Sequence, residues 1–272
     1  MSRYVELPAK GKVLVSTDLH GNLEDFRQLT RHYLELREAN AHAYWVILGD
    51  VVHGPDGSAR ARNPTLYDYE DQSREIVAEV IALEHRFPDE VFFVIGNHEW
   101  AHVGGPRTRK FHVDEAEHLE STMSLSEIRA MHVLIHESYL AIATPCGALL
   151  CHGSPAKIPS LEALNEIDFA FLGPRSQGFD LVSDIITAYG QSESDTEAML
   201  RRLSSPGADL RFVVHGHDRD EKGIFFEQNN QVCVVIFGAL RHEKRFVVLD
   251  LTKKYEMENL KTGNIVRRLY PD

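Results

Sequence analysis

The chain has 272 residues, 43% of them hydrophobic, so it is long enough to bury a domain-sized core. Its 41 acidic residues outnumber 29 Lys and Arg, and the resulting charge of −12 repels the phosphate backbone of nucleic acids. The sequence shows neither a membrane-length apolar run nor a charged-then-apolar leader, and its three cysteines lack metal-pair spacing. We therefore expect a cytoplasmic protein that binds neither nucleic acid nor membrane.

Apolar, β-branched runs alternate with amphipathic patterns along the chain, which predicts an α/β fold. The expected strands span residues 12–16, 44–48, 91–95, 210–214, 224–227, 231–237, 244–250 and 264–269, with a hairpin over 139–151. Helices are expected after Asn22, over 71–86, within 111–135 and, two or three of them, within 160–204. Residues 54–70, rich in Gly, Pro, Arg and Tyr, are expected to form a long loop. No linker-like stretch interrupts the chain between residues 18 and 217, so one domain over residues 1–272 is predicted.

Polar residues follow five of the expected strands at the point where each strand ends. They are Asp18 and His20, Asp50, Asn97 and His98, His152, and His215 and His217. Open α/β sheets place their ligand sites at the carboxyl ends of strands, and neighbouring glycines let the backbone approach a bound group closely. One such residue is usually part of a turn, but five in succession predict a shared site.

The side chains at these strand ends form a set of metal ligands. Six of them offer carboxylate, amide or imidazole donors and no thiolate: Asp18, His20, Asp50, Asn97, His152 and His217. Such donors suit manganese, iron, zinc or similar ions. Because one carboxylate can bridge two ions, six residues suffice to hold a pair of metals about 3.5–4 Å apart.

The polar residues belong to five short motifs that span most of the chain. These are Asp18-Leu19-His20-Gly21, Gly49-Asp50-Val51-Val52, Gly96-Asn97-His98-Glu99, His152-Gly153 and Gly216-His217. Together they resemble the motifs of the calcineurin-like metallophosphoesterase superfamily, and most closely those of its phosphoprotein phosphatase (serine/threonine protein phosphatase) branch. Gly-Asn-His-Glu is the most specific of the five.

The resemblance implies both a fold and a division of roles in the site. The implied fold is an αββα sandwich of two mixed sheets flanked by helices. Asp18 and His20 would hold a first divalent ion, which Asp50 would share with a second ion. The resemblance also implies that the remaining ligands of the second ion are Asn97, His152 and His217. It implies that His98 is the general acid.

The activity implied by the resemblance is hydrolysis of phosphomonoesters by water that two divalent ions activate. Manganese is the favoured metal, and iron or zinc are alternatives. The substrate would be phosphoserine or phosphothreonine in a protein, or a small phosphorylated metabolite. Two alternatives remain: hydrolysis of dinucleoside polyphosphates, and a scaffold of the same fold without turnover. The complete set of ligands and His98 favours an enzyme over a scaffold.

The chain departs from the branch beyond the bridging aspartate. The resemblance leads us to expect an Arg-Gly that clamps phosphate, but Val51-Val52-His53-Gly54 follows Asp50. The acid that orients the catalytic histidine and a second arginine, near Tyr189, are also not evident. The candidates to replace the phosphate clamp are His53, Arg107 and Arg109, with Arg62 and Arg175 as further basic residues. Residues 231–237 and 244–250 resemble a closing hairpin of the branch.

Overall fold

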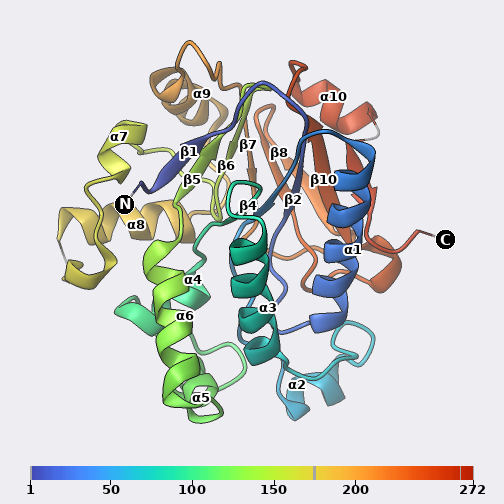
Figure 1. The fold of residues 1–272 in the computed structure, drawn as a ribbon, viewed down its shortest axis with the longest axis vertical. Coiled ribbons are helices and arrows are strands. Elements are labelled where there is room, and N and C mark those ends of the chain that lie inside the picture. The colour runs from blue at the N-terminus through green and yellow to red at the C-terminus, as the bar shows by residue number, and fades with distance from the viewer. Residues whose placement is uncertain (1, 174–175, 264, 272) are drawn as a thin grey trace.

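The chain is described by a computed structural model that covers residues 2–173, 176–263 and 265–271. Its strands form two mixed sheets (Figure 1). The five-stranded sheet has the order β11 (Val266–Arg268), β10 (Arg245–Asp250), β2 (Lys12–Ser16), β3 (Ala43–Ile47) and β4 (Val91–Phe93). The six-stranded sheet has the order β1 (Tyr4–Glu6), β5 (Ala141–Ala143), β6 (Ala148–Leu150), β7 (Phe212–His215), β9 (Gln231–Val234) and β8 (Ile224–Glu227).

The alternation of side chains along the strands explains why the two sheets pack face to face. In β2, Val13 and Val15 belong to a core shared with strands of the six-stranded sheet, whereas Leu14 belongs to the core under the helices. Successive strand residues point to opposite faces, so a strand with apolar residues at every position must be covered on both sides. The sheets are therefore the two inner layers of a four-layer αββα sandwich, as the resemblance implies.

Helices cover the outer faces of the two sheets. The α-helices are α1 (Leu23–Ala39), α2 (Gly57–Arg62), α3 (Ser73–Arg86), α4 (Asn97–Trp100), α5 (Glu115–Ser121), α6 (Leu125–Glu137), α7 (Leu161–Leu164), α8 (Gln177–Thr187), α9 (Glu193–Leu203) and α10 (Met257–Thr262). Short 3-10 turns are η1 (Ala101–Val103), η2 (Phe169–Phe171) and η3 (Arg241–Glu243). Helices α1 and α3 lie side by side against the five-stranded sheet, while α7 and α9 contact the six-stranded sheet (Figure 1).

Most of the expected elements are present, with shifts of a few residues at their ends. Asn22 caps α1, as predicted, by accepting a hydrogen bond from the backbone N–H of Asp25. Residues 111–135 contain two helices, because Ser124 and Glu127 form a capping box that begins α6. Strand β1 and helix α10 were not among the expected elements.

Two expectations about irregular segments are wrong. Residues 54–70 are not a continuous loop, because Asp56 caps the six-residue helix α2 within them. Residues 231–237 and 244–250 do not form a closing hairpin. Strand β9 ends at Val234 and pairs with β7 and β8, whereas β10 pairs with β2 and β11 in the other sheet. The intervening residues carry the chain from one sheet to the other.

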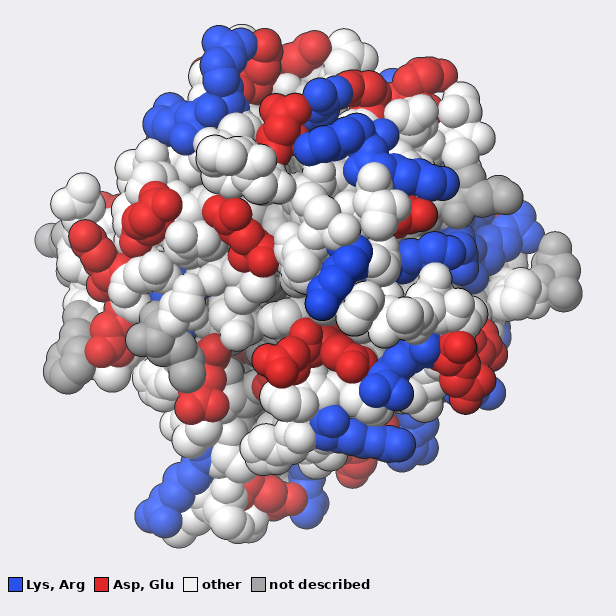
Figure 2. Space-filling model, turned by 45° about the horizontal axis from the view of Figure 1, so that its top comes forward, with Lys and Arg blue, Asp and Glu red and all other residues white. Residues whose placement is uncertain are grey.

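The surface mixes charges of both signs. On the face drawn in Figure 2, Lys and Arg side chains lie among Asp and Glu side chains instead of forming one continuous basic area. Within the described part of the chain, none of the helices combines the length and the apolar character needed to cross a bilayer.

Candidate metal centre

Five loops at the carboxyl ends of strands meet at one edge of the sandwich. The loops after β2, β3 and β4 belong to the five-stranded sheet, and those after β6 and β7 belong to the six-stranded sheet. They bring together six residues that we call the ligand cluster: Asp18, His20, Asp50, Asn97, His152 and His217. Four of the six are buried, and Asn97 and His217 are partly exposed. Both sheets therefore contribute side chains to one site.

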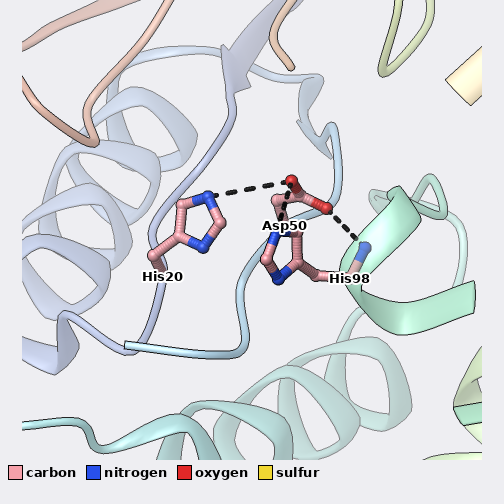
Figure 3. Close-up of side chains that lie close together, drawn as sticks. All are labelled: His20, Asp50 and His98. Atoms are coloured by element: carbon pink, nitrogen blue, oxygen red, sulfur yellow. Dashed lines mark hydrogen bonds and ion pairs between the residues drawn. The ribbon is translucent and has the colours of Figure 1, made fainter. Parts of the chain in front are cut away.

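Asp50 lies at the centre of the ligand cluster. Its Oδ2 atom is 3.7 Å from Nε2 of His20 and 3.4 Å from Nε2 of His152. The Nε2 atom of His98 lies 3.9 Å from the same oxygen, and the backbone N–H of His98 donates to Oδ1 of Asp50 at 3.0 Å (Figure 3). One carboxylate thus contacts imidazoles from three different loops, which is the position that a bridging ligand needs.

The backbone is strained at the same positions. Among the described residues, five of the six non-glycine residues with positive φ lie at this site: Asp18 (50°), His20 (43°), Asp50 (51°), His53 (67°) and His217 (65°). This conformation costs about 1–3 kcal/mol per residue, so it persists only where the surrounding packing enforces it. Gly96 leaves room for the carboxylate of Asp50, because a Cβ atom there would overlap Oδ1.

Backbone carbonyl groups fix the ring orientation of two imidazoles. Nδ1 of His20 donates to the carbonyl oxygen of His53 at 3.2 Å, and Nδ1 of His152 donates to that of Leu48 at 2.5 Å. Because the proton is held at Nδ1, the Nε2 lone pair of a neutral ring faces the cluster. This arrangement is typical of histidines that bind metal through Nε2.

The electrostatics of the cluster favour an added positive charge. Burial lowers the pKa of His20 to about 3 and that of His217 to about 4, so both rings are neutral near pH 7. Burial also opposes a charge on His152, but the carboxylate of Asp50 outweighs it and raises the pKa of His152 to about 9. The proton on His152 therefore compensates the acidic groups, and a bound cation would take over that role.

Glu99, the last residue of Gly-Asn-His-Glu, joins two of the loops. Its carboxylate is buried and accepts hydrogen bonds from the backbone N–H groups of Asp50 and Val51, both at 2.8 Å, and of Gly96 at 3.0 Å. Burial raises the pKa of Glu99 to about 7, and the charge of Asp50 adds to this effect. The glutamate of the motif thus positions Asp50 and is not itself a ligand.

The donor set fits divalent cations. Two groups of three potential ligands share Asp50: one contains His20 and His98, and the other contains His152 and His217. Asp18 and Asn97 lie next to these groups, since Oδ1 of Asp18 is 3.9 Å from His20 Nε2 and Oδ1 of Asn97 is 3.2 Å from His152 Nε2. Imidazole, carboxylate and amide donors around one shared carboxylate suit manganese, iron or zinc.

The two ring nitrogens of His98 face different neighbours. Its Nε2 faces Asp50, and its Nδ1 lies 2.9 Å from Nδ1 of His53. Nε2 of His53 is in turn 3.0 Å from Nε2 of His102, and Nδ1 of His102 donates to Glu120 at 2.7 Å. The sequence reasoning did not identify His102 or Glu120. The spacing of four residues between His98 and His102, which places two side chains on one helical face, was the available signal.

The basic residues near the site differ in where they point. Arg107 is exposed and pairs with Asp114, Arg109 is exposed, and Arg62 is exposed on α2. Lys110, which was not among the candidates, is largely exposed as a residue, but its Nζ turns into the site. There it lies 3.3 Å from Nε2 of His20 and 4.1 Å from the centre of the Phe237 ring.

Two further residues were singled out from the sequence. Arg175 lies outside the described residues. His215 is buried in β7, and its Nε2 is 3.6 Å from Glu227 of β8. His215 therefore contacts the neighbouring part of the six-stranded sheet.

Comparisons with known proteins bear on the family and the fold of this chain. A family model described as calcineurin-like phosphoesterase matches residues 11–221. A protein serine/threonine phosphatase from Saccharomyces cerevisiae has a similar structure, with a TM-score of 0.62, 17% identity, and coverage of 98% of this chain and 82% of that chain. A cold-active protein-tyrosine phosphatase from a psychrophilic Shewanella species has a TM-score of 0.61, 14% identity, and coverage of 93% and 78%. No curated protein matches this chain.

Proposed function

The chain belongs to the calcineurin-like phosphoesterase family of metal-dependent hydrolases, and we propose that it hydrolyses phosphomonoesters, with phosphoserine or phosphothreonine in proteins as the first substrate class. The observation that carries the proposal is the position of Asp50, which belongs to both groups of cation ligands and contacts His98. The architecture that this chain shares with a serine/threonine phosphatase supports the choice of substrate at the level of the fold.

We assign the metal ligands as the family resemblance implies. Asp18 and His20 would hold one ion, Asp50 would be shared by both ions, and Asn97, His152 and His217 would complete the second ion. A pair of manganese ions is favoured, and iron or zinc ions are alternatives. Such ions would stabilise charge on the phosphoryl oxygens and lower the pKa of an attacking water.

His98 is the general acid in this proposal. Its Nε2 faces the cluster, so a proton held there can pass to the oxygen that leaves the phosphorus atom. The Nδ1 atom points away from the cluster and is occupied by His53. The ring therefore presents one nitrogen to the substrate and uses the other to fix its orientation.

Lys110 takes the place of the missing phosphate-clamping arginine. Its Nζ lies beside His20, and the charges of Asp50 and Asp18 attract it into the site. A phosphate dianion brings compensating negative charge to the same place. Because one ammonium group contacts phosphate as a point charge, this clamp is weaker and less directional than a bidentate arginine.

A second candidate substrate class is phosphotyrosine. The Tyr189 ring is 58% exposed and lies 5.0 Å from the His217 ring, where it can pack against an aromatic leaving group. The Shewanella neighbour, named a protein-tyrosine phosphatase, shares the fold. Dinucleoside polyphosphates remain the alternative that the sequence raised.

The test is hydrolysis by protein stripped with a chelator and reloaded with manganese, zinc, magnesium or no metal. The panel contains phosphothreonine and phosphotyrosine peptides, an aryl phosphomonoester, its diester analogue and diadenosine tetraphosphate. We expect metal-restored turnover of the monoesters, and the preferred peptide then decides between the two classes. Turnover of diadenosine tetraphosphate alone would replace the proposal, and a protein that binds metal but hydrolyses nothing would support the scaffold alternative.

A further inference from the structure

A line of hydrogen bonds leads from His98 away from the ligand cluster. It runs from Nδ1 of His98 to Nδ1 of His53 (2.9 Å), and from Nε2 of His53 to Nε2 of His102 (3.0 Å). It ends with Nδ1 of His102 at the carboxylate of Glu120 (2.7 Å). We call these four residues the histidine relay. The three imidazoles are buried, with 5%, 2% and 8% of His98, His53 and His102 exposed, whereas the Glu120 side chain is 30% exposed.

The carboxylate at the end of the relay determines the direction of every hydrogen bond in it. An ionised carboxylate only accepts, so His102 must donate from Nδ1 to Glu120. A neutral His102 then accepts at Nε2, which makes His53 the donor at its own Nε2. His53 consequently accepts at Nδ1, and His98 donates from its Nδ1. The only arrangement of protons that satisfies all three bonds leaves Nε2 of His98 directed at the cluster.

The burial of the two middle rings keeps this arrangement neutral. His53 and His102 are both buried, and burial lowers the pKa of His102, although hydrogen bonding to Glu120 opposes this effect. A neutral imidazole has one donor and one acceptor nitrogen, which is what a middle member of the relay needs. Each ring nitrogen of His53 faces another imidazole, so no nitrogen of His53 is left to bind phosphate.

Glu115 is a rival acid for His98. Its buried Oε2 lies 3.6 Å from Nδ1 of His98 and has no hydrogen-bond partner, while its Oε1 accepts from the backbone N–H of Phe111. At 3.6 Å it is outside hydrogen-bonding distance, whereas His53 is within it. The Thr108 hydroxyl is also 3.3 Å from Nδ1 of His53 and contributes a longer, weaker contact.

We propose that His53, His102 and Glu120 are positioning residues that hold the Nδ1 proton of His98 in a hydrogen bond and so fix its ring, so that the second proton of the charged ring lies at Nε2 and faces the leaving oxygen. The role rests on the proposed function, because it matters only if His98 protonates a leaving oxygen. The relay then supplies what the sequence lacks, an acid that orients the catalytic histidine. Within the relay, His53 and His102 transmit the effect of Glu120 to His98.

The experiment compares Glu120→Gln, which removes the charge and keeps the size, with His102→Gln, which breaks the link to Glu120. The control is His132→Gln, because His132 contacts Glu120 at 3.4 Å but lies outside the relay. Turnover is measured on an alkyl phosphate, whose leaving oxygen needs a proton, and on 4-nitrophenyl phosphate, whose leaving group needs it less. We expect Glu120→Gln and His102→Gln to lose about tenfold on the alkyl ester and little on the aryl ester. His132→Gln should behave as wild type.

A second readout is independent of turnover. Two-bond ¹H–¹⁵N correlation spectra of the protein loaded with a diamagnetic divalent ion report which nitrogen of each neutral imidazole is protonated. We expect protons at Nδ1 of His102, Nε2 of His53 and Nδ1 of His98 in the wild type. Glu120→Gln should produce a mixture of tautomers at His53, because an amide can both donate and accept.

The two readouts separate failure of the relay from failure of the proposed function. Equal turnover losses on both esters, or unchanged tautomers in Glu120→Gln, would overturn the relay. The relay would also be overturned if Glu115→Gln lost more turnover on the alkyl ester than on the aryl ester while Glu120→Gln did not. That result would assign the orienting role to Glu115. Absence of turnover in the wild type would overturn the proposed function, and the tautomers alone would then decide whether the relay exists.

Discussion

The ligand cluster and the other three members of the histidine relay lie on opposite sides of His98, and the cluster and the relay are built in different ways. Each member of the cluster is placed by a strand end, and four of the six have positive φ. Members of the relay come from the loop after β3, from α4, from η1 and from α5, and they are held largely by one another. A ligand can therefore be replaced without moving its neighbours, whereas the relay works only as a continuous line.

This difference separates what substitutions should do. A change in the cluster should alter metal content, since its side chains converge on one carboxylate. A change in the relay should leave metal content unaltered and reduce only the step that needs a proton. The following predictions test that separation, from the largest expected effect to the smallest.

Asp50→Asn should have the largest effect. An amide carries no charge and bridges two cations poorly, so both ions should be lost together and turnover should fall further than in any other variant. Metal content measured by mass spectrometry decides the point. Retention of one ion per chain would contradict a bridging role for Asp50.

His98→Asn should reduce turnover by at least about a hundredfold, because it removes the proposed general acid. Metal content and thermal stability should stay near those of the wild type, since His98 is not among the six proposed ligands. Unchanged turnover would remove His98 from the mechanism. A parallel loss of one ion would instead make His98 a ligand, as its grouping with His20 and Asp50 allows.

Lys110→Gln should raise KM by about tenfold with a smaller change in kcat, the equivalent of losing one charge-assisted hydrogen bond of about 1.5 kcal/mol. Arg109→Gln is the matched comparison, because Arg109 is exposed in the same loop. We expect a smaller rise in KM from that variant. An equal or larger rise in KM for Arg109→Gln would assign the phosphate contact to Arg109, one of the candidates from the sequence.

The relay should make the protein sensitive to acid. The pKa values of His53 and His102 lie below their ordinary value of 6.5 in the folded state, so the unfolded chain binds more protons below about pH 6.5. The free energy of unfolding should therefore fall as pH drops below about 6.5. His102→Gln should lose less stability than wild type between about pH 7 and 5 in urea titrations, while the exposed His85→Gln should match wild type. An unchanged slope in His102→Gln would show that the ring is not held neutral.

The sequence predicted the cluster more completely than the relay for a physical reason. Asp18, Asp50, Asn97 and His152 lie within three residues of the end of an apolar run. The edge of a sheet brings such positions together, whichever conformation the loops adopt. Glu120 lies 18 residues from His102, and their contact depends on how α5 packs. Lys110 was missed in the same way, since the direction of one side chain in a loop decides whether it or Arg109 enters the site. The strand order could not be predicted from the sequence either, since β9 and β10 belong to different sheets.

The division of the proposed ligands between the two sheets has a consequence for how the chain matures. The ligands from the five-stranded sheet lie between residues 18 and 97, and those from the six-stranded sheet lie at residues 152 and 217. During synthesis, the first group leaves the ribosome well before the second, so the early half exposes two carboxylates and an imidazole without their partners. On the proposed ligand assignment, tight binding of two ions must wait for residue 217 to emerge and for the sheets to dock. Metal uptake would then be a late event that links the two halves of the chain.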